Sequence, residues 1–115
     1  PQDFMLWQPT CHHNDCLLER ADKFLHTPGY EKMPLFYIWG HSFEFDRNVN
    51  WQLLEKICSY LGGRDDVWYC TNIEAVEYIT ALLRVYIKNG WVYNPTDRVI
   101  YCGKGKIEPN GSVKI

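Results

Sequence analysis

Apolar residues in the first part of the chain follow two alternating patterns. Unbroken apolar runs at residues 4–7, 35–39 and 67–70 predict buried strands, because a strand covered on both faces has no polar side. After each run, apolar residues recur at helical spacing, in segments that begin at Leu17, Trp51 and Ile73. Strand followed by helix, three times over, predicts parallel strands joined by right-handed crossovers.

The pattern changes after residue 84. Short β-branched and aromatic segments follow, separated by turn-forming dipeptides, which predicts antiparallel strands and hairpins. The segments are 85–87, 91–93, 98–101 and 112–115, and the dipeptides are Asn89-Gly90, Asn94-Pro95 and Asn110-Gly111. The sequence therefore predicts three parallel β/α units in residues 1–84 and a β-rich extension of the same domain in residues 85–115.

Several boundaries of the helices have local signals. Asn14 or Asp15 is expected to cap the first helix, and Pro28-Gly29 is expected to end it. Thr71 and Glu74 have the spacing of a capping box at the start of the third helix.

Three parallel strands would leave sheet edges exposed, so we expect either a larger barrel or a partner that covers them.

Composition removes several classes of partner. The chain has 115 residues and a net charge of −2, without the dense basic patch that nucleic acids select. No apolar run reaches the length of a membrane span. The five cysteines are odd in number and lack the spacing of a secreted disulfide framework, so we expect a cytoplasmic protein. The chain opens on Pro1 rather than methionine, which leaves two alternatives open, a cut product of a longer protein or a natural truncation.

His41 is the first candidate for chemistry. It follows the apolar run 35–39 and Gly40, and in α/β folds the chemistry sits where strands end. A loop over residues 41–50 is expected next, in which strand-like alternation would turn Glu44 away from His41. Position alone leaves two readings open, a functional imidazole or a hydrogen-bonded loop residue.

Three segments carry a resemblance to a known family. Residues 7–15, 36–46 and 62–74 look like the C-terminal half of bacterial polysaccharide deacetylases, the NodB-homology proteins of carbohydrate esterase family four. The resemblance implies a distorted (β/α) barrel that hydrolyses N-acetyl or O-acetyl groups on sugars. In that family a divalent metal such as zinc, held by one Asp and two His, polarises the acetyl carbonyl and activates water.

The resemblance also assigns roles to residues of this chain. Trp39-Gly40-His41 fits the late family motif of an apolar residue, any residue and a histidine. His41 would then be the general acid that protonates the leaving group, and Trp39 would line the pocket for the acetate methyl. His12 and His13 would line the barrel mouth and either bind sugar or orient His41. The alternative for this pair is a capped helix start with two surface imidazoles.

The departures from the family limit what this chain is expected to do alone. It has neither an Asp-Asp pair followed by glycine nor a His-x-x-x-[Ser/Thr]-His motif, which supply the metal ligands in the family. The chain therefore resembles the back half of the enzyme, and its partner would be the missing N-terminal half or a second copy. The alternative is a non-catalytic carbohydrate-binding or assembly domain.

The segment Cys11-His12-His13-Asn14-Asp15-Cys16 also invites a reading as a metal site. Adjacent histidines at a strand end rarely point at one ion, and Cys-x4-Cys is looser than the spacing of a zinc ribbon. The sequence therefore predicts no metal bound by this chain. A Cys11–His12 nucleophile pair is not expected either, because chain neighbours seldom have the required geometry.

Overall fold

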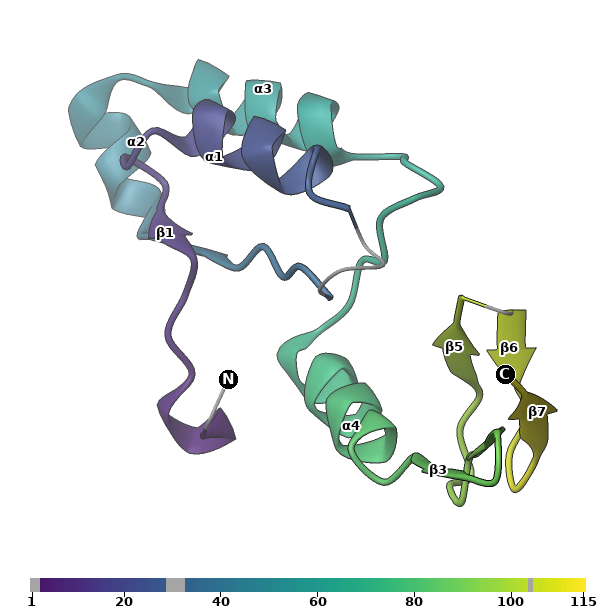
Figure 1. Cartoon of the computed structure of the whole chain (residues 1–115). Helices are drawn as coiled ribbons and strands as arrows, with labels where there is room; N and C mark the ends of the chain where they lie inside the picture. Colours follow the sequence, from purple (N-terminus) through teal and green to yellow (C-terminus); the bar gives the residue numbers. More distant parts are fainter. Residues whose placement is uncertain (1–2, 29–32, 104) are drawn as a thin grey trace. The chain divides into compact units, whose positions relative to one another are not determined.

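The computed structural model describes residues 3–28, 33–103 and 105–115. Within these ranges the chain is a mixed α/β protein with four α-helices and seven short strands. The strands form three small sheets, none of which closes into a barrel. The chain divides into two compact units, Pro1–Trp68 and Tyr69–Ile115, and Figure 1 shows the elements of each.

The first unit contains one parallel strand pair and three α-helices. Its elements are the 3-10 helix Phe4–Leu6, β1 (Cys11–His12), α1 (Leu17–Leu25), β2 (Ile38–Trp39), α2 (Ser42–Asn48) and α3 (Trp51–Leu61). β1 and β2 pair in parallel, with Cys11 opposite Ile38 and His12 opposite Trp39. The pairing begins before the strands, since the Thr10 amide donates to the Tyr37 carbonyl at 2.7 Å.

The core of this unit lies between α1, α3 and the strand pair. Figure 1 shows α1 and α3 side by side. Four buried residues form its centre, and four partly buried ones pack against them: Cys11, Leu17, Ala21 and Ile57, then Phe36, Ile38, Leu53 and Leu61. The rings of Phe24 and Phe36 stack at 5.4 Å and extend this contact toward β2. Because Cys11 of β1 and Ile38 of β2 both pack in this core, the two strands lie next to each other and end at the same edge of the unit.

The second unit consists of one helix and two antiparallel sheets. Its elements are α4 (Asn72–Leu82), β3 (Tyr86–Lys88), β4 (Trp91–Tyr93), β5 (Ile100–Cys102), β6 (Gly105–Ile107) and β7 (Ser112–Lys114). The larger sheet has the order β3-β4-β7, and β5 pairs with β6. Asn89 and Gly90 both have positive φ, as the two-residue β3–β4 turn requires. The buried Asn94 amide donates to the carbonyls of Ile107 and Glu108 and so joins the two sheets.

Several predictions from the sequence are confirmed. The three expected helices correspond to α1, α3 and α4, and the tail is antiparallel. Thr71 caps α4 through its hydroxyl, and Glu74 reaches back to the Thr71 amide at 2.7 Å. Parallel pairing is confirmed for β1 and β2 alone among the described residues, and β1 lies outside the predicted apolar runs. Strand β6 was not among the predicted strands, because Gly105-Lys106-Ile107 has neither an apolar run nor a flanking turn dipeptide.

The three predicted buried strands are wrong. In the run 4–7, Phe4–Leu6 form a short 3-10 helix in which Met5 is 90 % exposed, and the Asp3 carboxylate accepts the Met5 amide hydrogen. Residues 35–39 keep only two strand residues, and Trp39 is 47 % exposed. Residues 67–70 form no strand, and Trp68 is 58 % exposed. An apolar run becomes a buried strand only if other strands flank it and helices cover it. In the described parts of the chain, the only parallel strands are β1 and β2, each two residues long.

Two local predictions are also wrong. The expected loop over residues 41–50 contains α2, and its first turn carries Glu44. Neither Asn14 nor Asp15 caps α1: the N-cap is Cys16, with φ 48° and no side-chain hydrogen bond to the helix. The expected end of this helix at Pro28-Gly29 is consistent with the structure, because α1 ends at Leu25 and Pro28 follows three residues later, while Gly29 lies outside the described residues.

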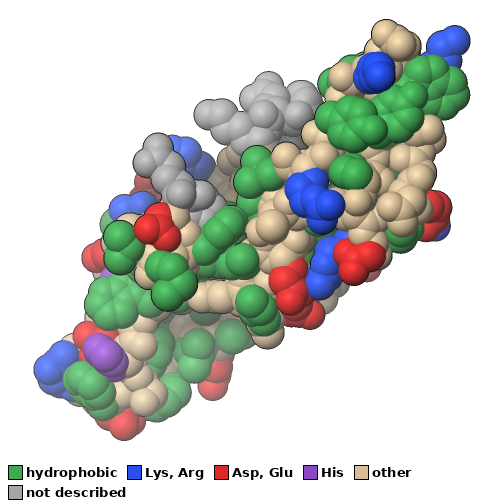
Figure 2. All heavy atoms as spheres, turned by 90° about the horizontal axis from the view of Figure 1, so that it is seen from below, with side chains coloured by type: hydrophobic (Ala, Val, Ile, Leu, Met, Phe, Trp, Pro, Cys, Tyr) green, Lys and Arg blue, Asp and Glu red, His purple; other side chains and the backbone are tan. Residues whose placement is uncertain are grey.

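Hydrophobic and polar side chains are intermixed on the surface. On the face drawn in Figure 2, hydrophobic side chains lie among charged and other polar ones. Across the described ranges, no helix has both the length and the apolar character needed to cross a membrane.

Candidate functional site

The ends of β1 and β2 bring four of the predicted residues to one edge of the first unit. His12 lies opposite Trp39, and the His13 amide donates to the Trp39 carbonyl at 3.0 Å. Gly40 follows, and His41 is the N-cap of α2. The parallel register therefore brings two imidazoles from one segment close to an indole and a third imidazole from another.

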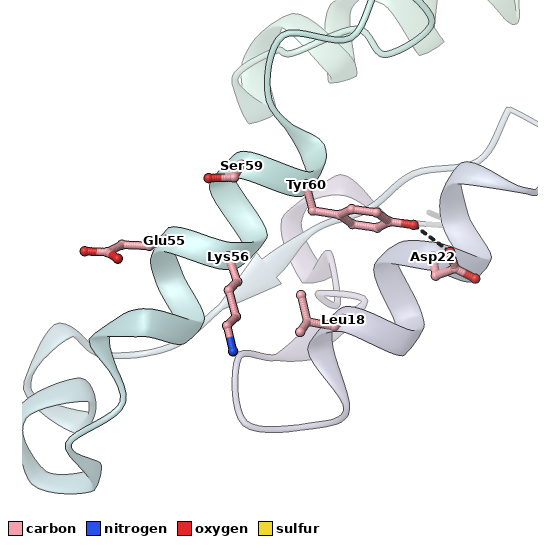
Figure 3. Close-up of a pocket in the computed structure, with 6 residues that line it drawn as sticks. All are labelled: Leu18, Asp22, Glu55, Lys56, Ser59 and Tyr60. Carbon is pink, nitrogen blue, oxygen red and sulfur yellow. Dashed lines mark hydrogen bonds between the residues drawn. The ribbon is translucent and has the colours of Figure 1, made fainter.

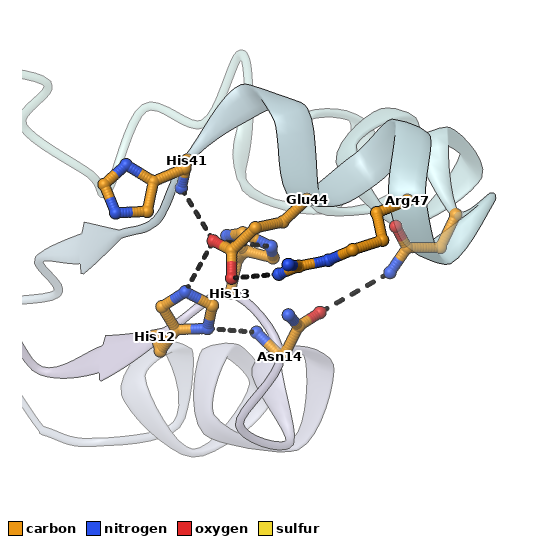
Figure 4. Close-up of polar contacts among 7 residues, drawn as sticks. His12, His13, Asn14, His41, Glu44 and Arg47 are labelled. Carbon is orange, nitrogen blue, oxygen red and sulfur yellow. Dashed lines mark hydrogen bonds and ion pairs between the residues drawn. The ribbon is translucent and has the colours of Figure 1, made fainter.

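Glu44 connects these two segments. As the third residue of α2 it points back toward the helix start, where its Oε2 accepts the His41 amide hydrogen at 2.9 Å. The same oxygen lies 2.9 Å from His12 Nε2 and 3.9 Å from His13 Nε2 (Figure 4). The amide of His41, followed by the hydrogen bond from His12, lowers the pKa of Glu44. The side chain is therefore a carboxylate at neutral pH.

His12 has both ring nitrogens occupied. Its Nδ1 accepts the Asn14 amide hydrogen at 3.2 Å, so the neutral ring carries its proton on Nε2 and donates it to Glu44. The ring lies edge-on to Trp39, with centroids 4.7 Å apart. His12 is thus oriented from two sides by polar contacts and from a third by an aromatic face.

His13 is buried without a hydrogen bond at one nitrogen. The residue is 4 % exposed, and its ring stacks on Phe45 at 4.3 Å and lies 4.2 Å from the ring of His12. Its Nε2 has no hydrogen-bond partner within the described parts of the chain. Gly40 makes room for the ring, because a Cβ there would lie 1.7 Å from His13 Nδ1.

His41 differs from the other two histidines because it is exposed. Its ring stacks on Phe43 at 5.1 Å and meets Trp39 edge-on at 5.9 Å. Figure 4 shows the ring turned away from the Glu44 carboxylate. The guanidinium of Arg47 lies 3.7 Å from Glu44 Oε1 and 5.4 Å from the centre of the Phe43 ring.

Glu44 belongs to the site, although the sequence predicted that its side chain lies away from His41. That prediction assumed strand-like alternation after His41, whereas the segment is the helix α2, and Glu44, its third residue, folds back toward the helix start. A glutamate three residues after a helix N-cap is the signal that would have identified it. The expectation that the adjacent His12 and His13 do not point at one position is also wrong. The strand ends at His12, and one ligand atom each from His12, His13 and Glu44 lies within 4.8 Å of the others.

Neither cysteine of the Cys-x4-Cys segment belongs to this cluster. Cys11 is buried in the core, and this burial raises the pKa of its thiol, which keeps it protonated at neutral pH. Cys16 is exposed and caps α1. A nucleophilic Cys11–His12 pair therefore has no support.

A shallow groove between α1 and α3 contains none of the predicted site residues. Figure 3 shows it lined by Leu18, Asp22, Glu55, Lys56, Ser59 and Tyr60. The Tyr60 hydroxyl donates to Asp22 Oδ1 at 2.5 Å, and this hydrogen bond raises the pKa of the phenol. The phenol therefore serves as a neutral bridge between the two helices.

Comparisons with protein-family models, curated proteins and solved structures found no match to this chain. The likeness to polysaccharide deacetylases therefore rests on the sequence motifs alone. Functional statements about the site depend on its geometry and on those motifs.

Proposed function

We propose that this chain carries the proton-donor side of a hydrolase that removes acetyl groups from sugars. The observation that carries the proposal is the exposed His41 imidazole beside the half-exposed Trp39 indole, at the end of a parallel strand pair. Sugar rings stack on aromatic faces, and a histidine imidazole can act as a general acid. These two groups bind and protonate different parts of one substrate.

The roles of the chain's own residues follow from the reaction. When water adds to an acetyl carbonyl, the intermediate collapses as the bond to the sugar nitrogen or oxygen breaks. His41 supplies the proton that this leaving atom needs, and Trp39 holds the sugar beside it. His12 contacts the Trp39 ring and so helps to position it.

The metal of the family is a separate matter. It would polarise the carbonyl and activate water, and its ligands lie in motifs that this sequence does not contain. His12, His13 and Glu44 come from other positions in the chain, so no step of the hydrolysis is assigned to them. Under this proposal the complete active site needs the N-terminal half of a (β/α) barrel, either upstream in the same protein or in a partner.

A second function, carbohydrate binding without catalysis, is favoured by a different observation. Trp39 and Trp68 are both exposed, and exposed indoles suffice for sugar binding without any nucleophile. The two functions differ in whether acetate is released.

Sugar binding is the first test. N-acetylglucosamine oligomers are titrated into the 115-residue chain while tryptophan fluorescence is recorded. Trp39→Ala should remove the fluorescence change, whereas Trp91→Ala, which removes an exposed indole of β4, should leave it. A saturable change that survives Trp39→Ala, or no change in the parent chain, would overturn the assigned surface.

Acetate release is the second test. The 115-residue chain should release none, whereas a protein extended by its upstream coding segment should release acetate. In the extended protein His41→Ala should lower kcat by roughly 10²–10⁴-fold with little change in KM, the range for loss of a general acid. The control His26→Ala removes an exposed histidine at the end of α1. Acetate release by the 115-residue chain itself, abolished by His41→Ala, would show that no other half is required, and binding without release in both proteins would favour the second function.

A further inference from the structure

We propose that His12, His13 and Glu44 bind a divalent cation of the zinc class. This site is independent of the deacetylase proposal, because its residues lie outside the positions that hold the metal in that family. The set consists of two imidazoles and one carboxylate whose ligand atoms all lie within 4.8 Å of one another. Imidazole nitrogens and a single carboxylate suit zinc and neighbouring transition metals, whereas calcium and magnesium prefer oxygen ligands.

The spacing of the three atoms is close to what one ion requires. Bonds of about 2.0–2.1 Å to a tetrahedral ion put neighbouring ligand atoms roughly 3.3 Å apart. Glu44 Oε2 lies 2.9 Å from His12 Nε2 and 3.9 Å from His13 Nε2, one distance on each side of this value. The ligand atoms of the two imidazoles lie within 4.8 Å of each other. Movement of the His12 ring and the carboxylate toward the His13 nitrogen would therefore bring all three atoms to an ion. Three protein ligands leave a fourth position open to water or another small ligand.

The buried imidazole of His13 is the second, independent observation. Its Nε2 points at the Glu44 carboxylate from 3.9 Å, too far for a hydrogen bond, and it has no other partner in the described ranges. A buried polar atom without a partner is costly, and a bound cation would satisfy it. The stack on Phe45 and the close fit against Gly40 hold this ring where it is, so the nitrogen is fixed in advance of binding.

The surrounding contacts orient the ligands as outer partners do in metal sites. The His41 amide donates to Glu44 Oε2, and the second lone pair of this oxygen, which accepts from His12 in the structure, would turn to the ion when His12 gives up that proton. The Arg47 guanidinium lies nearer to Oε1, at 3.7 Å, and its side chain is largely exposed, so solvent screens its charge. The hydrogen bond from His41 lowers the pKa of Glu44 and keeps the ligand ionised.

Binding through His12 Nε2 has one specific consequence. That nitrogen now carries the ring proton that it donates to Glu44, so an ion there displaces the proton to Nδ1. On Nδ1 the proton would face the Asn14 amide hydrogen, and the 3.2 Å contact between them would have to open. The Asn14 amide therefore reports on the occupancy of the site.

The test is a titration of the 115-residue chain with Co²⁺, followed by competition with Zn²⁺. We expect visible absorption bands of a four- or five-coordinate cobalt complex with one ion per chain, lost when zinc is added. In NMR spectra the Asn14 amide should shift with zinc, with the side-chain resonances of His12 and His13. No substrate is present, so the result is separate from the sugar-binding and acetate-release tests.

Variants show which residues are ligands. His12→Ala and Glu44→Gln should each weaken zinc binding at least tenfold, and neither removes the buried ring of His13. The matched control is His26→Ala, because His26 forms an exposed histidine–carboxylate pair with Asp22 at 3.4 Å and has no third ligand in the described residues. Equal weakening by His26→Ala, or binding in the parent chain no tighter than in the His12→Ala and Glu44→Gln variants, would overturn the site and indicate adventitious binding only.

Discussion

Within each of the two units, side-chain hydrogen bonds join residues that lie at different distances along the sequence. In the second unit, the buried Asn94 side chain bonds to Arg98, four residues away, and to Glu108, fourteen away. In the first unit, the contact between His12 and Glu44 spans 32 residues, and that between Thr10 and Leu35 spans 25. The β-rich unit thus combines the local contacts of one buried amide with the longer-range pairing of β4 and β7, whereas the histidine cluster joins side chains 32 residues apart.

This difference decides where each unit is vulnerable. Closing a longer loop costs more conformational entropy before its contacts compensate for it. The second unit concentrates its polar contacts on one side chain, since Asn94 Oδ1 also accepts from the Thr96 amide and hydroxyl. The first unit depends instead on a close fit between Gly40 and the buried His13 ring. One substitution in each unit can therefore test the comparison.

Asn94→Ala should have the largest effect. The side chain is 1 % exposed, and its loss leaves buried carbonyls and the Thr96 amide without partners, at about 1–3 kcal/mol per group. We expect about 4 kcal/mol of destabilisation, seen by amide hydrogen exchange as lost protection throughout residues 86–114. Asn48→Ala, at the exposed end of α2, should change exchange little. Unchanged protection of β4 and β5 in the Asn94 variant would contradict the role given to this amide.

Gly40→Ala should have the next largest effect, confined to the first unit. Its new Cβ would lie 1.7 Å from His13 Nδ1, so the ring must leave its place between Phe45 and His12. Overpacking of this kind costs about 1–3 kcal/mol, measurable by urea unfolding of this unit. The control is Gly103→Ala, where a Cβ would have no neighbour within 4 Å among the described residues. Equal stability of the two variants would show that His13 is not held as described.

Thr71→Ala tests the smaller, local contribution of a helix cap. The Thr71 hydroxyl accepts the Glu74 amide hydrogen, and loss of such a cap costs about 1 kcal/mol. Thr71→Ser should restore the helix content measured by circular dichroism, because it keeps the hydroxyl. Thr80→Ala, in the same helix, leaves the cap intact. A Ser variant as unstable as the Ala variant would mean that the methyl group, not the hydroxyl, matters.

The smallest expected effect is a pH dependence at the same cap. The Thr71 amide and hydroxyl lower the pKa of Glu74 below its ordinary value of 4.5 in the folded chain. The stabilisation is therefore complete above that ordinary value, and it is lost as the pH falls through the lower folded-state pKa. Glu74→Gln should flatten this acid-dependent loss of α4, followed by circular dichroism. Glu55→Gln, in α3, should leave the profile unchanged; a flattening there as well would assign the effect to overall charge.

The contrast between the units also explains how far the sequence could be read. Helices α1, α3 and α4 were predictable from periodicity, and the Thr71–Glu74 cap and the Asn89-Gly90 turn from local signals. These features depend on residues within a few positions of one another. The apolar runs at residues 4–7 and 67–70 were misread because burial of a strand depends on neighbours that the run itself does not specify.

The candidate site divides in the same way. The sequence by itself determined that His12, His13 and His41 follow apolar segments, that Trp39 ends one of them, and that the chain lacks the metal motifs of the family it resembles. Only the tertiary structure decided that the two adjacent histidines converge and that Glu44 joins them. The physical reason is that β1 and β2 end side by side and α2 starts three residues after β2 ends, so its first turn returns the carboxylate to the His12 imidazole, 32 residues earlier, and to its neighbour His13.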